Sequence, residues 1–597
     1  MNLRLAVKSL EVEKKKKICR LRFMLTPIRD RLSKHLEPYF KDKSVAELFE
    51  IPKELDHGHL SIPVFSLARE YKKAPPVIAK EIANQLLTKS IPGVARIEAV
   101  GGYINFHLDG LEIFSTLYNE TKKAGQRLGF RSLGAGQTII VEYSSPNVAK
   151  PMHVGHLRAT VIGQALRNLA DSQGYKVIGL NHLGDWGVQF GKLAYAYRRW
   201  GSEYDFENDA FESLYKLYVR FHQEAEKDPE MEREGSLLFK KMEDGDPELL
   251  KLWRRFVDIS MNEYEHNWQR LGVKHYLVRG ESFYNDRLKN VEKLLQTKGL
   301  LIESEGAMVV DLSDEKMPPC LIFKSDGASL YATRDIASAI FRFEELKVDA
   351  SLYVVGAEQT LHFKQLFSVL RRLGFAWWSR CHHIGFGLYR FKDPNLGGKM
   401  SSRKGQIIRL EDLLNRAVEL VKERMSQKAG EKERNIDEIA EQVGVGAIIF
   451  NDLVNDRVRD VEFDWEHALS FEGDSGPYVQ YVHVRCASIL AKSGRKVTEE
   501  IRGEQLRVLD SAEERRLIKS LLRYEDILSQ AYQNFKPNIL ANYLLELCTD
   551  FNHFYHNHKI LGGDAELIDS RLALVWITQS VIRGGLKILS MAAPQEM

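Results

Sequence analysis

Two closely spaced histidines are the strongest candidates for chemistry in this sequence. His153 and His156 lie at positions i and i+3, with Gly155 between them. On a helix this spacing places both imidazoles on one face, where they can donate hydrogen bonds to phosphate oxygens as charge develops in a reaction. The glycine leaves the backbone bare, so that a planar base can lie against it. The pattern therefore indicates a nucleotide site.

The same histidines allow two simpler interpretations, because short motifs often mislead. They can cap a helix beside a satisfied core, or they can form half of a zinc site. A zinc site needs further ligands, and no third one stands at the usual spacing. The five cysteines are scattered without a C-x-x-C pair, which argues against structural zinc and disulfides and favours a reducing cytosol. We therefore expect no structural metal.

A second polar group lies between glycines at residues 397–405. This segment reads Gly-Gly-Lys-Met-Ser-Ser-Arg-Lys-Gly, so three cations and two hydroxyls follow one another closely. Such a loop can fold over a polyphosphate and neutralise it, and phosphoryl-type transfer needs mainly positioning and charge stabilisation. Taken alone, a basic loop is more often a solvated surface.

The histidine pair lies between a predicted strand and a predicted helix. The short β-branched run at 138–143 is typical of a buried strand, and Pro146 and Pro151 follow it. Apolar residues then recur at helical spacing over 154–169, and residues 176–180 form a second predicted strand. A parallel strand–helix–strand unit is the simplest interpretation. Such sheets bind ligands at the carboxyl ends of their strands, where a helix N-terminus favours phosphate.

The rest of the chain divides by pattern into further units. Residues 201–272 are charged and helical in period without obvious chemistry, strands and helices alternate after Gly306, and the pattern is helical from about Gln406 onward. We predict a basic extension at 1–23, an α+β module at 24–130, a parallel-sheet domain at 131–410 with a helical insertion at about 201–300, a helical connector at 411–470 and a C-terminal helical domain at 471–597.

The overall composition narrows the class of protein. The chain has 597 residues, of which 44% are hydrophobic and 28% charged, with a net charge of +3. This balance excludes a mostly disordered chain, a collagen and an isolated coiled coil, and it leaves nucleic-acid binding to local patches. No apolar run reaches the roughly 18 residues of a membrane span. The basic start at 1–23 is best interpreted as a solvated tail, with a transit peptide as the weaker alternative.

Taken together, the two polar groups resemble the paired signature of the class I aminoacyl-tRNA synthetases. H-x-G-H follows the first predicted strand and K-M-S follows the last, in the order and separation of that family. No G-x-G-x-x-G or Walker loop competes with this interpretation. Four further stretches are similar to the arginyl-tRNA synthetase family in particular: residues 141–151, 181–191, 329–335 and 473–481.

The resemblance implies a fold and an activity. The fold is a Rossmann-like parallel-sheet catalytic domain, with an α+β N-terminal module that contacts the outer corner of tRNA and an all-α C-terminal bundle that binds the anticodon. The activity joins L-arginine to ATP as arginyl-adenylate and passes it to the 3′-terminal ribose of tRNA(Arg), with release of AMP and pyrophosphate. The expected partners are ATP with Mg²⁺, L-arginine and tRNA(Arg), for a cytoplasmic monomer without membrane contact.

The resemblance also assigns residues to the amino acid. It places the arginine contacts at Glu142, Asn147, Tyr331, Asp335 and Gln359. A guanidinium presents a planar fork of donors and needs carboxylate or amide acceptors, which this set supplies. Tyr331 and Asp335 are four residues apart, so that they face one pocket if the segment is helical. The alternative for Asp335 is a surface ion pair with Arg334.

The remaining assignments concern ATP, catalysis and tRNA. The resemblance implies ATP contacts from Pro146, Asn147, Lys150, Pro151, His153, Gly155, His156, His362, Lys399, Met400 and Ser401. Catalysis falls to His153, Gly155, His156, Lys399 and Lys404, and tRNA contacts to Tyr478, Tyr481 and Arg485. His362 can equally be an ordinary histidine at a helix start. The family's K-M-S-K-S lysine is replaced here by Ser402, which leaves open which cation of the loop meets the phosphates.

Two other functions remain open on the sequence alone. A cysteinyl-tRNA synthetase shares the two signatures, but it carries zinc-ligand cysteines that this chain lacks. A tRNA-binding paralogue without activity would share the fold, but it would not need His153, Gly155, His156 and Lys399 together.

Overall fold

A computed structural model describes residues 25–40, 45–52, 54–323, 331–391, 408–426 and 435–597. Its centre is a five-stranded parallel sheet with the strand order β11-β10-β4-β5-β6. The strands are β4 Thr138–Glu142, β5 Lys176–Asn181, β6 Leu277–Val278, β10 Ala350–Tyr353 and β11 Cys381–His383. Helix α6 (Val154–Ser172) connects β4 to β5, which confirms the predicted strand–helix–strand unit.

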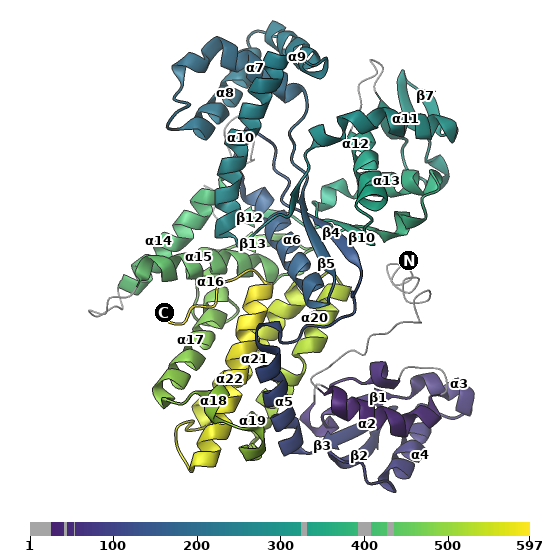
Figure 1. Cartoon of the computed structure of the whole chain (residues 1–597), viewed down its shortest axis with the longest axis vertical. Helices are drawn as coiled ribbons and strands as arrows, with labels where there is room; N and C mark the ends of the chain where they lie inside the picture. Colours follow the sequence, from purple (N-terminus) through teal and green to yellow (C-terminus); the bar gives the residue numbers. More distant parts are fainter. Residues whose placement is uncertain (1–24, 41–44, 53, 324–330, 392–407, 427–434) are drawn as a thin grey trace.

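The sheet is buried on both faces, as parallel sheets usually are. Ile139, Ile140 and Val141 of β4 are almost fully buried, because α6 packs on one side of the strand and a second core covers the other. That second core contains helices α11 (Leu288–Thr297), α12 (Tyr331–Ile340) and α13 (Thr360–Arg372). In Figure 1 these helices lie beside the sheet on the side opposite α14 (Leu410–Ser426).

The predicted helical insertion is shorter than expected. It consists of α7 Val188–Trp200, α8 Ala210–Ala225, α9 Glu230–Glu243 and α10 Pro247–Arg270, at the top of Figure 1. The chain then re-enters the sheet at β6, so the boundary at about 300 was wrong. Strand β6 has only two residues, which pair with the end of β5. So short a strand carries no periodic signal, and the sequence pattern missed it.

The strands on either side of Gly306 do not belong to the parallel sheet. A small antiparallel sheet contains β7 Leu301–Ser304, β8 Ala307–Val310 and β9 Cys320–Phe323. The C-terminal region also contains one strand where only helix was expected, because β13 (Val461–Phe463) pairs with β12 (Tyr389–Phe391). Both strands are too short for periodicity to reveal.

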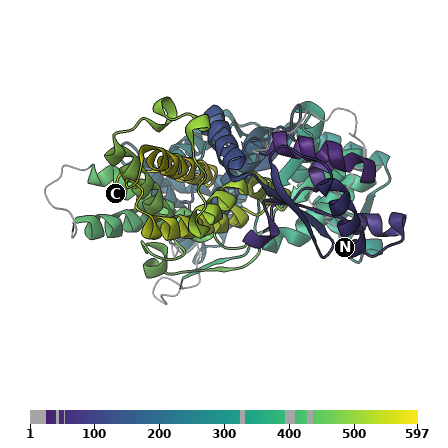
Figure 2. The same cartoon turned by 90° about the horizontal axis from the view of Figure 1, so that it is seen from below.

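The N-terminal module is α+β, as predicted. Its antiparallel sheet has the order β1-β3-β2, and helices pack on one face of it. The elements are α2 Thr26–Leu36, β1 Leu60–Pro63, α3 Ala68–Tyr71, α4 Pro75–Leu87, β2 Val94–Val100, β3 Tyr103–Leu108 and α5 Gly110–Ala124. Helix α5 reaches the C-terminal bundle, where the Tyr118 hydroxyl lies 2.8 Å from the Ile501 carbonyl oxygen. Figure 2 shows the module beside the bundle.

The C-terminal part is a helical bundle that contacts every other unit. Its helices are α14 and α15 Ile436–Leu453, α16 Trp465–Ala468, α17 Gly476–Ser493, α18 Val497–Glu500, α19 Ala512–Leu522, α20 Tyr524–Gln533, α21 Asn538–Asn557 and α22 Ala565–Ile588. The buried Arg158 of α6 joins the bundle to the parallel-sheet domain, because its Nε donates to Asp452 of α15 at 2.9 Å. Within the described ranges, no helix is long and apolar enough to span a membrane.

Candidate active site

The two histidines lie at the N-terminus of α6, beyond the carboxyl end of β4. His153 caps the helix, since its Nδ1 accepts from the Gly155 N–H at 3.0 Å, while Nδ1 of His156 accepts from the His153 N–H at 3.1 Å. The ring centroids are 4.0 Å apart. The capping geometry considered from the sequence is therefore present, and it leaves both Nε2 atoms as donors.

Burial keeps both imidazoles neutral. It lowers the pKa of His156 to about 3, with further contributions from His153 and Lys150, and it lowers the pKa of His153 in the same direction. A neutral imidazole whose Nδ1 accepts a hydrogen bond carries its proton on Nε2. The pair thus presents two N–H donors beside the partial positive charge of the helix N-terminus, an arrangement that suits phosphate oxygens.

The loop between β4 and α6 has a strained backbone. Ser144 and Ala149 have positive φ angles of 55° and 64°, a region that costs non-glycine residues energy. Helix α10 of the insertion holds both positions: the Trp268 indole donates to the Ser144 hydroxyl at 2.7 Å, and the Ala149 N–H donates to the Ser260 hydroxyl at 3.0 Å. The insertion therefore shapes the loop that precedes the histidines.

A third residue of α10 braces the centre of this loop. The buried Tyr264 hydroxyl lies 2.7 Å from the Asn147 carbonyl oxygen and 2.8 Å from that of Lys150. Asn147 also pairs in parallel with Gly184. A Cβ at residue 184 would lie 2.1 Å from the Asn147 Oδ1, so any larger residue there would displace the Asn147 side chain. The stretches at 141–151 and 181–191 are thus neighbours in space.

Glu142, the last residue of β4, is buried and paired with an internal arginine. Its carboxylate forms an ion pair with Arg342, whose guanidinium also donates to the Ser351 hydroxyl at 3.0 Å and lies 4.5 Å from the Tyr353 ring centroid. Arg342 belongs to a π-helical turn at Phe341–Glu345. Sequence reasoning missed it, because nothing in its spacing distinguishes it from a surface arginine.

Asp335 and His362 come together from α12 and α13. His362 Nε2 lies 2.6 Å from Asp335 Oδ2, and both side chains are about three-quarters buried. Burial opposes the charged imidazole, but the Asp335 carboxylate outweighs it and raises the pKa of His362. Tyr331 lies one turn before Asp335 and is 70% exposed, while Gln359 is exposed directly before α13. His362, predicted near the nucleotide, thus contacts a residue of the predicted arginine set.

A further carboxylate, Glu281, lies near this set and was not predicted. It follows β6, and its backbone N–H donates to the Leu183 carbonyl at 3.0 Å. Burial raises its pKa to about 8, Arg334 opposes the rise, and the charges of Asp335 and Asp185 add to it. The only available signal was a glutamate after the carboxyl end of a parallel strand, and that strand is too short to predict.

The candidate tRNA contacts of α17 also meet other residues. The Arg485 guanidinium lies 4.9 Å from the Tyr481 ring centroid and 5.0 Å from that of Tyr555 on α21. Asn552 of α21 bridges the set, since it accepts from Arg485 at 2.6 Å and donates to the Tyr478 hydroxyl at 2.9 Å. An arginine between two partly exposed aromatic rings forms a surface that suits stacked bases.

Several predicted residues lie outside the described part of the chain. These are Lys399, Met400, Ser401 and Lys404, together with residues 1–23. Pro146, Lys150 and Pro151 are in the loop before the histidines, and the Lys150 ammonium lies 5.1 Å from the Tyr218 ring centroid. Among the residues that the structure describes, no group of three or more His, Cys, Asp or Glu side chains could hold a metal ion.

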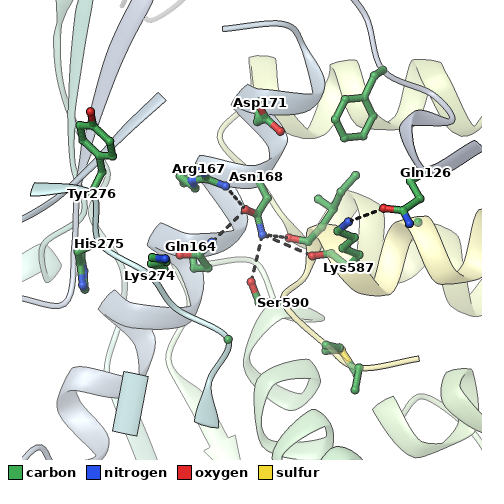
Figure 3. A pocket seen from close by; sticks show the side chains of 16 residues that line it. Gln126, Gln164, Arg167, Asn168, Asp171, Lys274, His275, Tyr276, Lys587 and Ser590 are labelled. Atoms are coloured by element: carbon green, nitrogen blue, oxygen red, sulfur yellow. Dashed lines mark hydrogen bonds between the residues drawn. The ribbon is translucent and has the colours of Figure 1, made fainter. Parts of the chain in front are cut away.

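A separate cavity of about 700 Å³ lies on the other part of α6. Figure 3 shows it between α6, the segment before β6 and the end of α22. Asn168 crosses it and donates to the Ile588 carbonyl at 3.0 Å and the Ser590 hydroxyl at 3.1 Å. None of the predicted site residues lines this cavity, and its central contacts join α6 to α22.

Comparison with known proteins agrees with this geometry. The family model "tRNA synthetases class I (R), catalytic domain" matches residues 120–465, the "DALR anticodon binding domain" matches 479–597 and the "Arginyl tRNA synthetase N terminal domain" matches 26–108. An arginine–tRNA ligase of Clostridioides difficile (strain 630) is 43% identical over 570 residues, which cover 96% of this chain and 99% of that protein.

Solved structures share the fold. The arginyl-tRNA synthetase of Thermus thermophilus superposes with a TM-score of 0.78 at 25% identity, covering 95% of this chain and 100% of that one. That of Plasmodium falciparum has a TM-score of 0.78 at 24% identity, with 97% and 100% covered.

Fold and site therefore define a class I aminoacyl-tRNA synthetase with an ATP substrate. Within this class the chain belongs to the arginyl-tRNA synthetase family, which confirms the fold class and the family predicted from the sequence. Its enzyme class is that of the family, an ATP-dependent arginine–tRNA ligase.

Proposed function

We propose that the carboxyl edge of the parallel sheet is where this chain forms arginyl-adenylate. The arginine carboxylate attacks the α-phosphate of ATP and pyrophosphate leaves, so that no protein nucleophile takes part. His153 and His156 donate from Nε2 to the phosphates at the start of α6. Lys399 and Lys404 neutralise the leaving pyrophosphate, and Mg²⁺ accompanies ATP.

The nucleotide contacts come from the loop before α6 and from the K-M-S segment. Gly155 leaves room for the base, and Pro146, Asn147, Lys150 and Pro151 line the approach to the histidines. Lys150, near the α6 N-terminus, adds positive charge beside the phosphates. Met400 and Ser401 approach from the second signature. His362 adds a further contact to the nucleotide, while its Nε2 is bonded to Asp335 of the arginine set.

The amino acid is recognised by acceptors at both of its ends. Asp335, Tyr331 and Gln359 meet the guanidinium, and Glu281 adds a further carboxylate close to them. Glu142 and Asn147 meet the α-amino end next to the reacting carboxylate. The observation that carries the proposal is this convergence: two neutral N–H donors at a helix N-terminus, a carboxylate at the end of β4 and one after β6 share one edge of the sheet.

The second step transfers the arginyl group to the 3′-terminal ribose of tRNA(Arg). The arginine and tyrosines of α17 contact the tRNA from the C-terminal bundle, where the matched domain is an anticodon-binding one, and the module at 24–130 contacts its outer corner. The enzyme works as a monomer in the cytoplasm.

The test is ATP-dependent charging of total tRNA with each of the twenty amino acids. We expect arginine alone to be charged, and we expect His156→Ala and Asp335→Ala to lose charging while they still bind tRNA. Charging with another amino acid would contradict the arginine pocket. Absence of charging by folded, tRNA-bound wild type would contradict the activity.

A further inference from the structure

One face of helix α8 contacts both sides of the proposed nucleotide site. Glu212, Tyr215 and Tyr218 recur every three residues and so share this face. The Glu212 carboxylate forms an ion pair with Arg409 at 2.8 Å, and the same guanidinium lies 5.4 Å from the Tyr215 ring centroid. Tyr218 lies under the Lys150 ammonium. A helix of the insertion thus contacts the segments on both sides of the histidines.

Arg409 lies where the chain pairs with the backbone of the histidine motif. The Val154 N–H donates to the Ile408 carbonyl at 3.2 Å, and the Leu410 N–H donates to the Met152 carbonyl at 2.9 Å. His153 and Arg409 form the antiparallel bridge between these two bonds. A shift of Arg409 therefore moves the backbone that carries His153.

The ion pair between Glu212 and Arg409 is too exposed to contribute much to the stability of the fold. The Glu212 and Arg409 side chains are 23% and 32% exposed, and pairs near the surface contribute little to the free energy of unfolding. Reaction rates respond more strongly, because a small misplacement of a reacting group slows a reaction that relies on positioning. A contact that is nearly neutral for folding can thus still set the rate.

We infer that Glu212 and Tyr215 are positioning residues for adenylate formation. They hold Arg409, and through the backbone pairing at 408–410 they fix the placement of His153 at the start of α6. This inference rests on the proposed function, in which His153 and His156 meet the phosphates. It gives α8, which showed no chemistry in its sequence, a role in the first step of the reaction.

The test is arginine-dependent exchange of pyrophosphate into ATP, with tRNA present, for wild type and variants. Glu212→Gln and Tyr215→Leu lower kcat about tenfold and leave the KM for arginine within about twofold of wild type. The control is Glu203→Gln, which breaks the Arg220–Glu203 pair of 2.7 Å elsewhere in the insertion; its rates equal those of wild type. Exchanging the charges, with Glu212→Arg and Arg409→Glu in one chain, restores most of the rate lost by either change alone.

Thermal unfolding of each variant separates positioning from folding, and Glu212→Gln unfolds at the wild-type temperature. The inference would be overturned if both α8 variants had wild-type rates, or if Glu203→Gln lost as much rate as they do. It would also be overturned if the two charge-exchange substitutions lowered the rate additively. If both α8 variants keep wild-type rates while His156→Ala is inactive, the inference about α8 is overturned and the proposed function still holds. A wild type without arginine-dependent exchange would overturn the proposed function itself.

Discussion

At the scale of single residues, the site combines groups that burial makes neutral with groups that burial leaves charged. His156 is a neutral donor because burial lowers its pKa to about 3. Glu142 keeps an ionic partner inside the protein, since Arg342 pairs with it. At Glu281 burial outweighs the opposing charge of Arg334 and raises the pKa to about 8. The Glu281 carboxyl group therefore titrates close to neutral pH.

We expect arginine binding to tighten as the pH rises toward 8. The guanidinium needs an ionised Glu281, and below a pKa of about 8 the group is mainly protonated in the empty site. Binding must then release a proton, which weakens it by up to roughly tenfold for each pH unit below that pKa. The KM for arginine in the exchange reaction, measured from pH 6 to 8, checks this dependence.

Glu281→Gln should raise the KM for arginine and flatten its pH dependence. The exposed Glu303 of β7 supplies the matched control, Glu303→Gln. His362 is bonded to Asp335, whose carboxylate raises the pKa of the imidazole against the effect of burial, so the profile is repeated in a His362→Gln background. A pH dependence that persists in Glu281→Gln and disappears with His362→Gln would assign the titration to the histidine instead.

At the scale of elements, helix α10 supports the loop of the site. Its polar contacts recur along one stripe, at Ser260, Tyr264 and Trp268. The same stripe begins with Trp253, whose indole donates to the Asp185 carbonyl at 2.6 Å. The insertion therefore supports the strained loop that contains Asn147 and Lys150.

Tyr264→Phe should both slow the reaction and lower the stability of the fold. The change removes one buried hydrogen bond to the loop carbonyls, which costs about 1–2 kcal/mol of unfolding free energy. We expect kcat for the exchange reaction to fall about tenfold, because Asn147 and Lys150 lose a fixed backbone. Urea unfolding and exchange kinetics on the same samples check both effects.

The control for this change is Tyr197→Phe in the same insertion. The Tyr197 hydroxyl accepts from the exposed Arg255 at 2.6 Å, so its loss should change neither stability nor rate. A wild-type kcat in Tyr264→Phe would show that the loop keeps its shape without α10.

At the scale of the whole molecule, the C-terminal bundle holds the other units together. Arg158 connects it to the catalytic sheet through Asp452, and Asn168 connects α6 to the end of α22. On the other side, the Lys519 ammonium donates to the Gly58 carbonyl of the N-terminal module at 3.0 Å. One helical unit therefore fixes both the catalytic domain and the module proposed to contact tRNA.

Lys519→Met should loosen the N-terminal module without loss of the catalytic fold. The change leaves the Gly58 carbonyl without its buried donor, at a cost of about 1–3 kcal/mol. Hydrogen exchange should accelerate in residues 54–58 and in α19, while β4 and α6 stay protected. The exposed Lys492→Met of α17 is the control, and equal protection in the two variants would contradict the docking role.

Local patterns in the sequence were enough to predict the family and the central unit of the fold. The strand at 138–142, the histidine motif and helix α6 are contiguous, so local periodicity and one motif sufficed to predict them. The same holds for the module at the start and for most C-terminal helices. The assignments of Lys399 and Lys404 also stand on the sequence alone, as predictions.

Only the tertiary structure decided which distant residues meet at the site. Arg342 pairs with Glu142, His362 bonds to Asp335, and Glu281 lies close enough to Asp335 to feel its charge, so that segments far apart in the chain meet here. Nothing in the sequence of the two-residue strand β6, or of the polar stripe of α10, indicates which residues they contact. Periodicity reports which face of an element is buried, but long-range packing decides which residue lies against that face. The contacts between the site residues depend on that packing.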